Sequence, residues 1–201
     1  DLSRRCPVVD PDDHHLYTSL GCAAENLVQA AAAYGLESKV SFDAARDGVR
    51  IELQPSANST TQASPLFAAM AQRQCTRNEY DGKPLSSDEL ALLQRAGSSD
   101  RVRLLLLTDK TKMEQVLEVI VQGNTVQVNN PAFAAELKDW IRFSAADAVR
   151  LGDGLYSATS GNPSLPAWLG KPMFNFFFTA KAENDKIAKQ MRSSAGVAVF
   201  V

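Results

Sequence analysis

The stretch from Gln54 to Ser64 constrains the fold most, because it cannot form a buried element. It is rich in serine, threonine, asparagine and glutamine and has no apolar periodicity. Segments of this composition bury too little apolar surface to order themselves, and they commonly connect folded parts. We therefore predict a linker at 55–64, which separates residues 1–54 from residues 65–201.

Patterned segments on both sides of this linker predict helices and strands. Before it, we expect a helix capped by Asp10 that runs to about Tyr34, then short strands at Ser38–Phe42 and Val49–Leu53. After it, caps and apolar patterns predict helices from Pro65 to about Gln74 and from Ser86 to Ala96, a strand at Arg101–Thr108, helices opening at Thr111, Asn130 and Ser144, a loop-rich stretch from Leu151 to Lys171, a helix at Asn184–Met191 and a strand from Gly196. The predicted class is α+β. The four consecutive leucines at Leu104–Leu107 are typical of a strand covered on both faces.

Charge and composition exclude several classes of function. The net charge is −2, so neither a nucleic-acid partner nor a membrane-surface patch is expected. No apolar run has the length of a membrane span. The three cysteines are widely spaced and favour a reducing compartment, so we expect a cytoplasmic protein without a disulfide framework. No metal site is expected, since His14 and His15 are adjacent on a predicted helix and point in different directions.

The densest polar arrangement lies shortly after the linker. Arg73 and Arg77 stand four residues apart, with Gln74, Cys75 and Thr76 between them. If a helix began or ended here, both guanidinium groups would lie on one face and could close on a single anion. Guanidinium groups suit phosphate oxygens, and a threonine hydroxyl adds a neutral donor. The same spacing also fits a solvated face or the last turn of a helix, where cations are favoured.

This segment resembles the start of a flavin-dependent nitroreductase domain. In that family an Arg-x-Ser-x-Arg/Lys pattern holds the FMN phosphate, and here a turn at Tyr80–Pro84 and a serine-capped helix follow it. The resemblance implies FMN as cofactor and a phosphate site built from Arg73, Gln74, Cys75, Thr76 and Arg77. Cys75 stands where the family has serine, so one hydroxyl donor is replaced by a weaker thiol.

The order of the similar segments implies a duplication. Ser19–Leu36 is similar to the long central helix of nitroreductases, which lies late in that domain, yet here it precedes the phosphate motif. Tandem nitroreductase-like units, as in the duplicated Acg-type branch, would have this order, and one chain would do the work of the usual homodimer. Similar segments at Asp147–Leu155, Leu165–Gly170 and Arg192–Phe200 extend the resemblance over most of the chain.

The resemblance implies a nitroreductase-like mixed sheet flanked by helices, in pseudo-dimeric units. Residues 1–54 would be the C-terminal part of a first unit and residues 65–201 the N-terminal part of a second. Both ends look cut, so we expect a fragment, incomplete at both ends. The second unit would carry an insertion at about 123–190, whose aromatic residues either cover the flavin as a lid or pack internally.

The departures from the family pattern limit the flavin contacts expected here. Nitroreductases have a Pro-Ser-Ser-x-x-Asn-x-Gln-Pro-Trp loop against the flavin ring, but the equivalent stretch, Ala96–Leu104, lacks its Asn, Gln, Pro and Trp. Lys39–Asp43 does not keep the Glu-Gly of the segment near flavin N5. The resemblance therefore implies one flavin per duplicated chain, with only its phosphate end held by the residues present.

Two functions follow as expectations. The first is an FMN oxidoreductase that passes hydride from NAD(P)H through the flavin to a quinone, nitro compound or similar acceptor, with no catalytic side chain assigned. Its partners would be FMN, NAD(P)H, a small-molecule acceptor and the second unit of an intramolecular pseudo-dimer or homodimer. The alternative is a non-catalytic protein that sequesters flavin or regulates its supply, with a closed lid.

Overall fold

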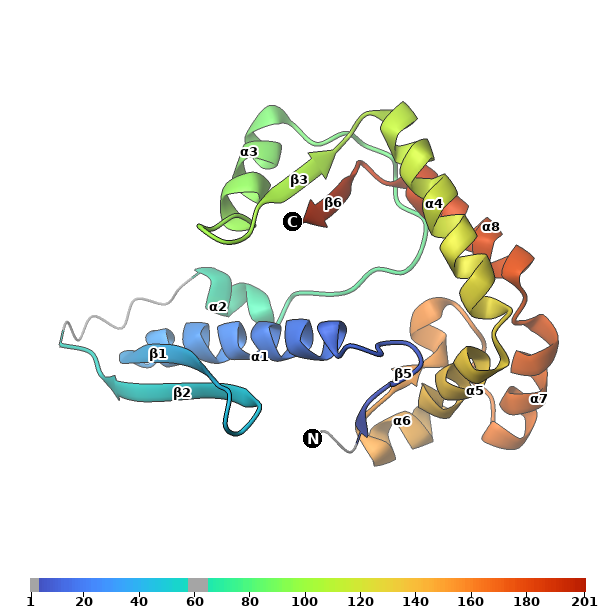
Figure 1. Ribbon diagram of the computed structural model, residues 1–201, viewed down its shortest axis with the longest axis horizontal. Helices are drawn as coiled ribbons and strands as arrows, with labels where there is room; N and C mark the ends of the chain where they lie inside the picture. The colour runs from blue at the N-terminus through green and yellow to red at the C-terminus, as the bar shows by residue number, and fades with distance from the viewer. Residues whose placement is uncertain (1–3, 58–64) are drawn as a thin grey trace. The chain divides into compact units, whose positions relative to one another are not determined.

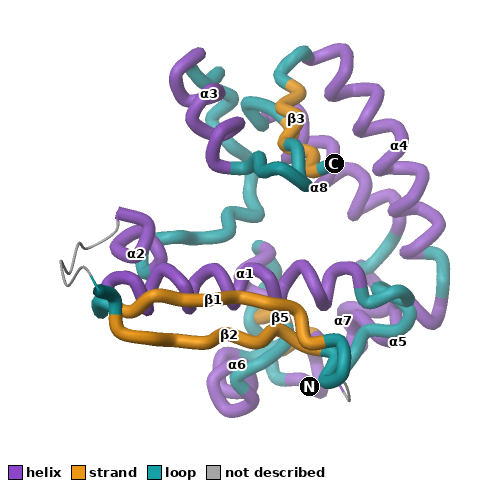
Figure 2. The backbone as a smooth tube through the Cα atoms, turned by 60° about the vertical axis from the view of Figure 1, so that its left-hand side comes forward, coloured by secondary structure: helices purple, strands orange, loops and turns teal. Residues whose placement is uncertain are grey.

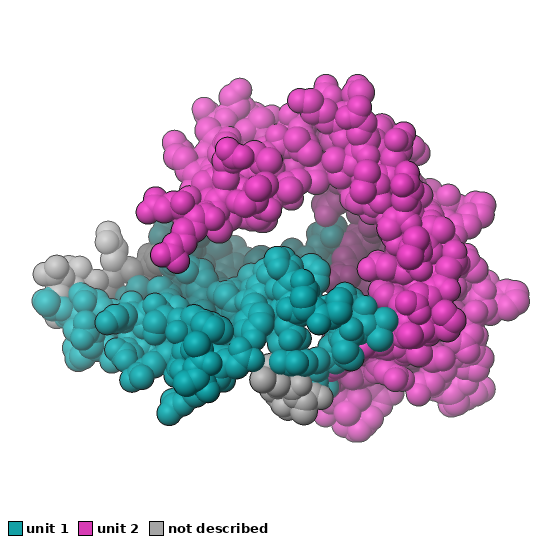
Figure 3. All heavy atoms as spheres, in the orientation of Figure 1, with its two compact units in different colours: residues 1–76 teal, residues 77–201 magenta. Residues whose placement is uncertain are grey.

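The computed structural model describes residues 4–57 and 65–201. Within these residues the chain is a mixed α+β protein with eight α-helices and three separate two-stranded sheets (Figure 1). It divides into two compact units, Asp1–Thr76 and Arg77–Val201 (Figure 3). The predicted α+β class is confirmed.

The first unit consists of one long helix and a hairpin. Its elements are α1 (His14–Ala33), β1 (Leu36–Asp43), β2 (Gly48–Pro55) and α2 (Pro65–Met70). Both predicted strands are present and pair antiparallel, with Val40 opposite Ile51. The hairpin lies along α1, which also contacts α2 (Figure 2). Most of the predicted linker, residues 58–64, lies outside the described residues.

The start of α1 differs from the prediction. The helix begins at His14, after Asp13 in the left-handed conformation, and not directly after Asp10. Asp10 nevertheless supplies the cap, because its two carboxylate oxygens accept the amides of His15 and Leu16 at 3.0 and 2.9 Å. Burial alone would raise the pKa of Asp10, but these amide hydrogen bonds outweigh it and hold the pKa below its usual value.

The second unit has more elements and a thin core. They are α3 (Ser87–Ala96), β3 (Leu104–Leu107), α4 (Lys110–Val128), α5 (Pro131–Trp140), β4 (Ile141–Arg142), α6 (Ala145–Leu151), β5 (Leu155–Tyr156), η2 (Ser157–Ser160), α7 (Ala167–Phe177), α8 (Ala180–Ser193) and β6 (Val197–Phe200). Its buried apolar side chains are Leu104, Met113, Leu117, Val128 and Phe143. The capping box predicted at Ser86 is present, with Ser86 and Glu89 each bonded to the other's backbone amide.

The strand predicted at Arg101–Thr108 is confirmed only in its centre. β3 pairs antiparallel with β6 alone, so the two strands form a ribbon. Leu104 is 3% exposed whereas its neighbour Leu105 is 37% exposed. The expectation of a strand covered on both faces is therefore wrong for these residues, because only one face of the ribbon has a packing partner.

Helices α4 and α8 form the longest packed pair of the second unit (Figure 1). Asn124 donates to Asn184, and Asn184 donates to Thr125, both across the pair. Arg192 forms two hydrogen bonds with the Glu114 carboxylate, at 2.9 and 3.0 Å. These side-chain contacts fix the register in which the two helices lie against each other.

The region from Leu151 to Lys171 is more regular than predicted. It contains β5, which pairs parallel with the earlier strand β4, the short helix η2 and the start of α7. α7 follows Pro166 and contains Gly170 and Pro172, which is why its helical pattern is weak in the sequence. The final helix, α8, begins at Ala180, four residues before the predicted start, with Thr179 as its cap.

Candidate functional site

The segment that carries the predicted phosphate site is not helical. α2 ends at Met70, the chain turns at Ala71–Gln72, and no helix or strand is present from Arg73 to Ser86. The predicted extension of this helix to Gln74 is therefore wrong, and helical spacing does not place Arg73 and Arg77 on one face. All five predicted residues, Arg73 to Arg77, are exposed.

The predicted site residues divide between the two units. Arg73, Gln74, Cys75 and Thr76 end the first unit, and Arg77 begins the second. Within the first unit, the Arg73 Nη1 donates to the Cys75 Sγ at 3.2 Å. The cysteine that replaces the family's serine thus contacts the first guanidinium group.

Arg77 is anchored through its backbone. Its carbonyl accepts a hydrogen bond from the Gln190 Nε2 on α8, at 2.6 Å. Three residues on, the Tyr80 amide donates to the Ser193 hydroxyl, also on α8, at 3.0 Å. The guanidinium group of Arg77 has no hydrogen-bond or ion-pair partner in the part of the chain that the structure describes, so it remains available to an anion.

The predicted turn at Tyr80–Pro84 is held by Asp81. The Asp81 carboxylate accepts the Lys83 amide at 3.1 Å and pairs with the Lys83 ammonium at 2.9 Å. The side-chain hydrogen bond to Lys83, and then its amide, lower the pKa of Asp81. Gly82 between them adopts a positive φ of 70°, which a residue with a Cβ rarely does.

Sequence reasoning missed a cavity inside the second unit. It has a volume of about 410 Å³ and is walled by apolar side chains from α5, β4, β5, α7 and α8. Arg77 lies at its edge, together with Glu183, Lys186 and Gln190 of α8. The aromatic run at Met173–Phe178 and the cap at Thr179 were the only signals of it in the sequence.

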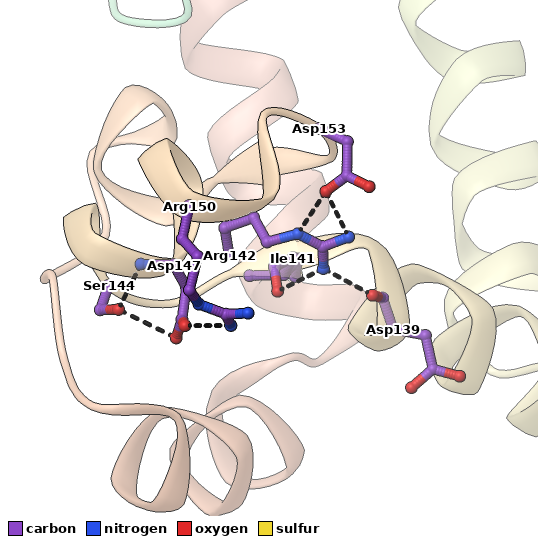
Figure 4. Close-up of polar contacts among 7 residues, drawn as sticks. All are labelled: Asp139, Ile141, Arg142, Ser144, Asp147, Arg150 and Asp153. Carbon is purple, nitrogen blue, oxygen red and sulfur yellow. Dashed lines mark hydrogen bonds and ion pairs between the residues drawn. The ribbon is translucent and has the colours of Figure 1, made fainter.

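The wall formed by β4 and β5 is held by an arginine (Figure 4). Arg142 donates from Nε and Nη2 to the Asp153 carboxylate, both at 2.8 Å, and from Nη1 to the Asp139 carbonyl at the end of α5. The side chains of Arg142 and Asp153 are 12% and 18% exposed. This partly buried clip keeps Ile141 and Phe143, the neighbours of Arg142, facing the cavity.

The aromatic residues of the predicted insertion have two different environments. Phe143, Phe174 and Phe178 pack on one another, with ring centroids 6.5 and 4.5 Å apart. Trp168 and Phe176 are 76% and 77% exposed. Internal packing therefore accounts for the first group. In the second group, Phe176 meets the exposed Phe177 edge to face, with ring centroids 4.9 Å apart.

Comparison with known proteins identified no relative. No protein-family model matches the chain, and neither the curated proteins nor the solved structures include a significant match. Within residues 4–57 and 65–201, no group of three or more His, Cys, Asp or Glu side chains could hold a metal ion. None of the helices in those ranges is both long enough and apolar enough to cross a bilayer.

Proposed function

We propose that this chain binds FMN through its phosphate and serves as an NAD(P)H oxidoreductase of the nitroreductase type. One observation carries the proposal. Arg73 and Arg77 are exposed on a segment without helix or strand, and neither guanidinium group has a carboxylate partner among the described residues. Cations left unpaired in this way favour a dianion as ligand.

The chemistry of the segment fits a phosphate monoester. Two guanidinium groups balance its two negative charges, and the Thr76 hydroxyl supplies a neutral donor. Cys75 accepts from Arg73 and so limits the directions that this guanidinium group takes.

The nitroreductase-like arrangement of sheet and helices is part of the same proposal. Bound FMN would supply hydride transfer from NAD(P)H to a quinone, nitro compound or similar acceptor. The residues of this chain would hold and neutralise the phosphate, and none is assigned as an acid or base. Ala96–Leu104 is assigned no contact with the flavin ring, because it lacks the Asn, Gln, Pro and Trp of the family's loop.

Paired variants test the phosphate site. Arg73→Ala combined with Arg77→Ala should lower FMN affinity by about 100-fold or more, since each charge-assisted hydrogen bond contributes about 1.5–3 kcal/mol. Arg101→Ala combined with Arg103→Ala removes the same charge elsewhere and should leave the affinity unchanged. Quenching of FMN fluorescence measures both. Equal affinities for the two double variants would contradict the proposal.

A second candidate function is flavin sequestration without turnover, and the Ala96–Leu104 stretch favours it. This stretch forms hydrogen bonds within itself. The Ser98 hydroxyl accepts the Leu104 amide at 3.1 Å, and the Ser99 amide donates to the Val102 carbonyl at 2.7 Å. A Cβ on Gly97 would lie 2.6 Å from the Leu104 side chain, so the loop is tightly packed. Steady-state NAD(P)H oxidation with added quinone by the FMN-loaded protein would exclude sequestration, and its absence would support it.

A further inference from the structure

The cavity of the second unit has the properties of a ligand site, and Arg77 at its edge is the one residue that it shares with the phosphate segment. Its volume of about 410 Å³ lies in the range of small-molecule pockets. Its lining residues all belong to the second unit, so it does not depend on how the two units are arranged. The Arg142 clip holds these walls in place, and so does the buried Ser157 hydroxyl, which lies 3.2 Å from the carbonyl oxygens of both Phe143 and Pro163 and can donate its one proton to either.

The interior of the cavity favours a flat ring. Phe143 and Phe174 meet edge to face, and Phe174 and Phe178 stack with an interplanar angle of 17°. These three rings line the cavity together with Phe177, which is 60% exposed. An aromatic guest gains from offset stacking and edge contacts in addition to the burial of its area.

The polar groups at the edge favour an anionic end on that guest. Lys186 donates one hydrogen bond, to the Ser160 carbonyl at 2.8 Å, so its ammonium keeps two further donors. The Gln190 amide is occupied by the Arg77 carbonyl, whereas the Arg77 guanidinium group has no partner among the described residues. Against these two cations stands one carboxylate, Glu183, so the edge carries a net positive charge.

We propose that this cavity binds a small aromatic acid, with the ring system among the phenylalanines and the carboxylate or sulfonate beside Lys186. The proposal goes beyond the FMN phosphate site and does not require it. Lys186 and Phe177 are the residues that distinguish it, because neither belongs to the Arg73–Arg77 segment.

Two fluorescent probes separate the ring from the charge. The aromatic acid is 1-anilinonaphthalene-8-sulfonate, and N-phenyl-1-naphthylamine has the same ring system without the sulfonate. The full chain should bind the sulfonate saturably, with one site per chain. Lys186→Gln should weaken the sulfonate about tenfold and the neutral amine less than about twofold, because only the charged end contacts this residue. Phe177→Ala should weaken both probes.

Matched controls lie on the same helices. Lys189→Gln on α8 removes the same charge outside the cavity, and Trp168→Ala on α7 removes an exposed ring that does not line the cavity; both should leave the two affinities unchanged. Arg73→Ala should also leave sulfonate binding intact while it weakens FMN, so failure of either proposal is recognised independently. Non-saturating binding, or equal effects of Lys186→Gln and Lys189→Gln, would overturn the inference. So would equal effects of Phe177→Ala and Trp168→Ala.

Discussion

Two glycines beside the Arg142 clip both adopt the left-handed backbone conformation, but they differ in the space that a side chain would have. Gly152 and Gly154 have φ values of 65° and 70°. A Cβ on Gly152 would meet nothing within 4 Å, but one on Gly154 would lie 2.3 Å from the Trp140 carbonyl oxygen and 3.0 Å from the Arg142 guanidinium carbon. The backbone can therefore accept a methyl group at one position only.

This pair gives a prediction at the residue scale. Gly152→Ala should lower the free energy of unfolding by about 1 kcal/mol, the cost of a left-handed alanine. Gly154→Ala adds the clash with Trp140 and should cost about 3 kcal/mol or more. Urea unfolding of the two variants measures the difference. Equal losses would show that the close approach between β4 and β5 is absent.

The sequence shows which side chains of the phosphate segment could bind an anion, but it did not predict their arrangement in space. The spacing of Arg73 and Arg77 suggested one helical face, yet α2 ends at Met70 and the segment is extended. No local signal distinguishes a helix end at Met70 from one at Gln74, since the chain carries no glycine or proline between them. Whether both guanidinium groups meet one phosphate stays a prediction.

Among the elements, capping signals were the most reliable. The predicted caps at Ser86, Asn130 and Ser144 are present, because each depends on contacts within one helical turn. The helix predicted to open at Thr111 instead begins at Lys110, with Asp109 as its cap. α7 was missed, since its pattern is interrupted by Gly170 and Pro172 and its stability depends on packing around Phe143. The cavity that α7 lines could not be predicted for the same reason.

The capping box of α3 gives a prediction at this scale. Ser86→Ala removes the acceptor of the Glu89 amide and one donor to its carboxylate, and should lower the free energy of unfolding by about 1 kcal/mol. Ser87→Ala, one position later and inside the helix, is the matched control and should have little effect. Chemical denaturation followed by circular dichroism tests both; a larger loss for Ser87→Ala would contradict the assigned cap.

The contact between α4 and α8 should depend on pH. The hydrogen bonds from Arg192 lower the pKa of Glu114 below its ordinary value of 4.5. A lowered folded-state pKa contributes stability that is fully present above the ordinary value and is lost as the pH falls through the folded-state pKa. Glu114→Gln should therefore lower the free energy of unfolding by a constant amount near pH 7. This difference from the unsubstituted protein should disappear in acid.

Glu118→Gln is the control for this titration. Glu118 lies one turn further along α4, is exposed, and forms no ion pair within the described residues. Glu118→Gln should change the free energy of unfolding only slightly, and this change should not vary with pH as that of Glu114→Gln does. Unfolding curves from pH 7 to pH 3 measure both variants, and a Glu114→Gln deficit that grows on acidification would contradict the ion pair.

For the whole molecule, the extended segment between the two units should respond to FMN. Arg73 and Arg77 are exposed trypsin sites outside any helix or strand. A phosphate held by both guanidinium groups would cover these bonds, so FMN should slow cleavage after Arg73 and Arg77 by about tenfold, whereas riboflavin should not. Cleavage after Arg95, in α3, is the internal control, and equal protection by both flavins would contradict the assigned contact.

The central claim is that this chain recognises the phosphate of a flavin nucleotide, and the FMN-to-riboflavin affinity ratio tests it most directly. Isothermal titration of the full chain should show FMN bound about 100-fold or more tightly than riboflavin, because the two ligands differ only in the group that the arginines would hold. In the Arg73→Ala and Arg77→Ala double variant the ratio should fall to about 1. Equal affinities in the unsubstituted chain, or no binding of either flavin, would contradict the account.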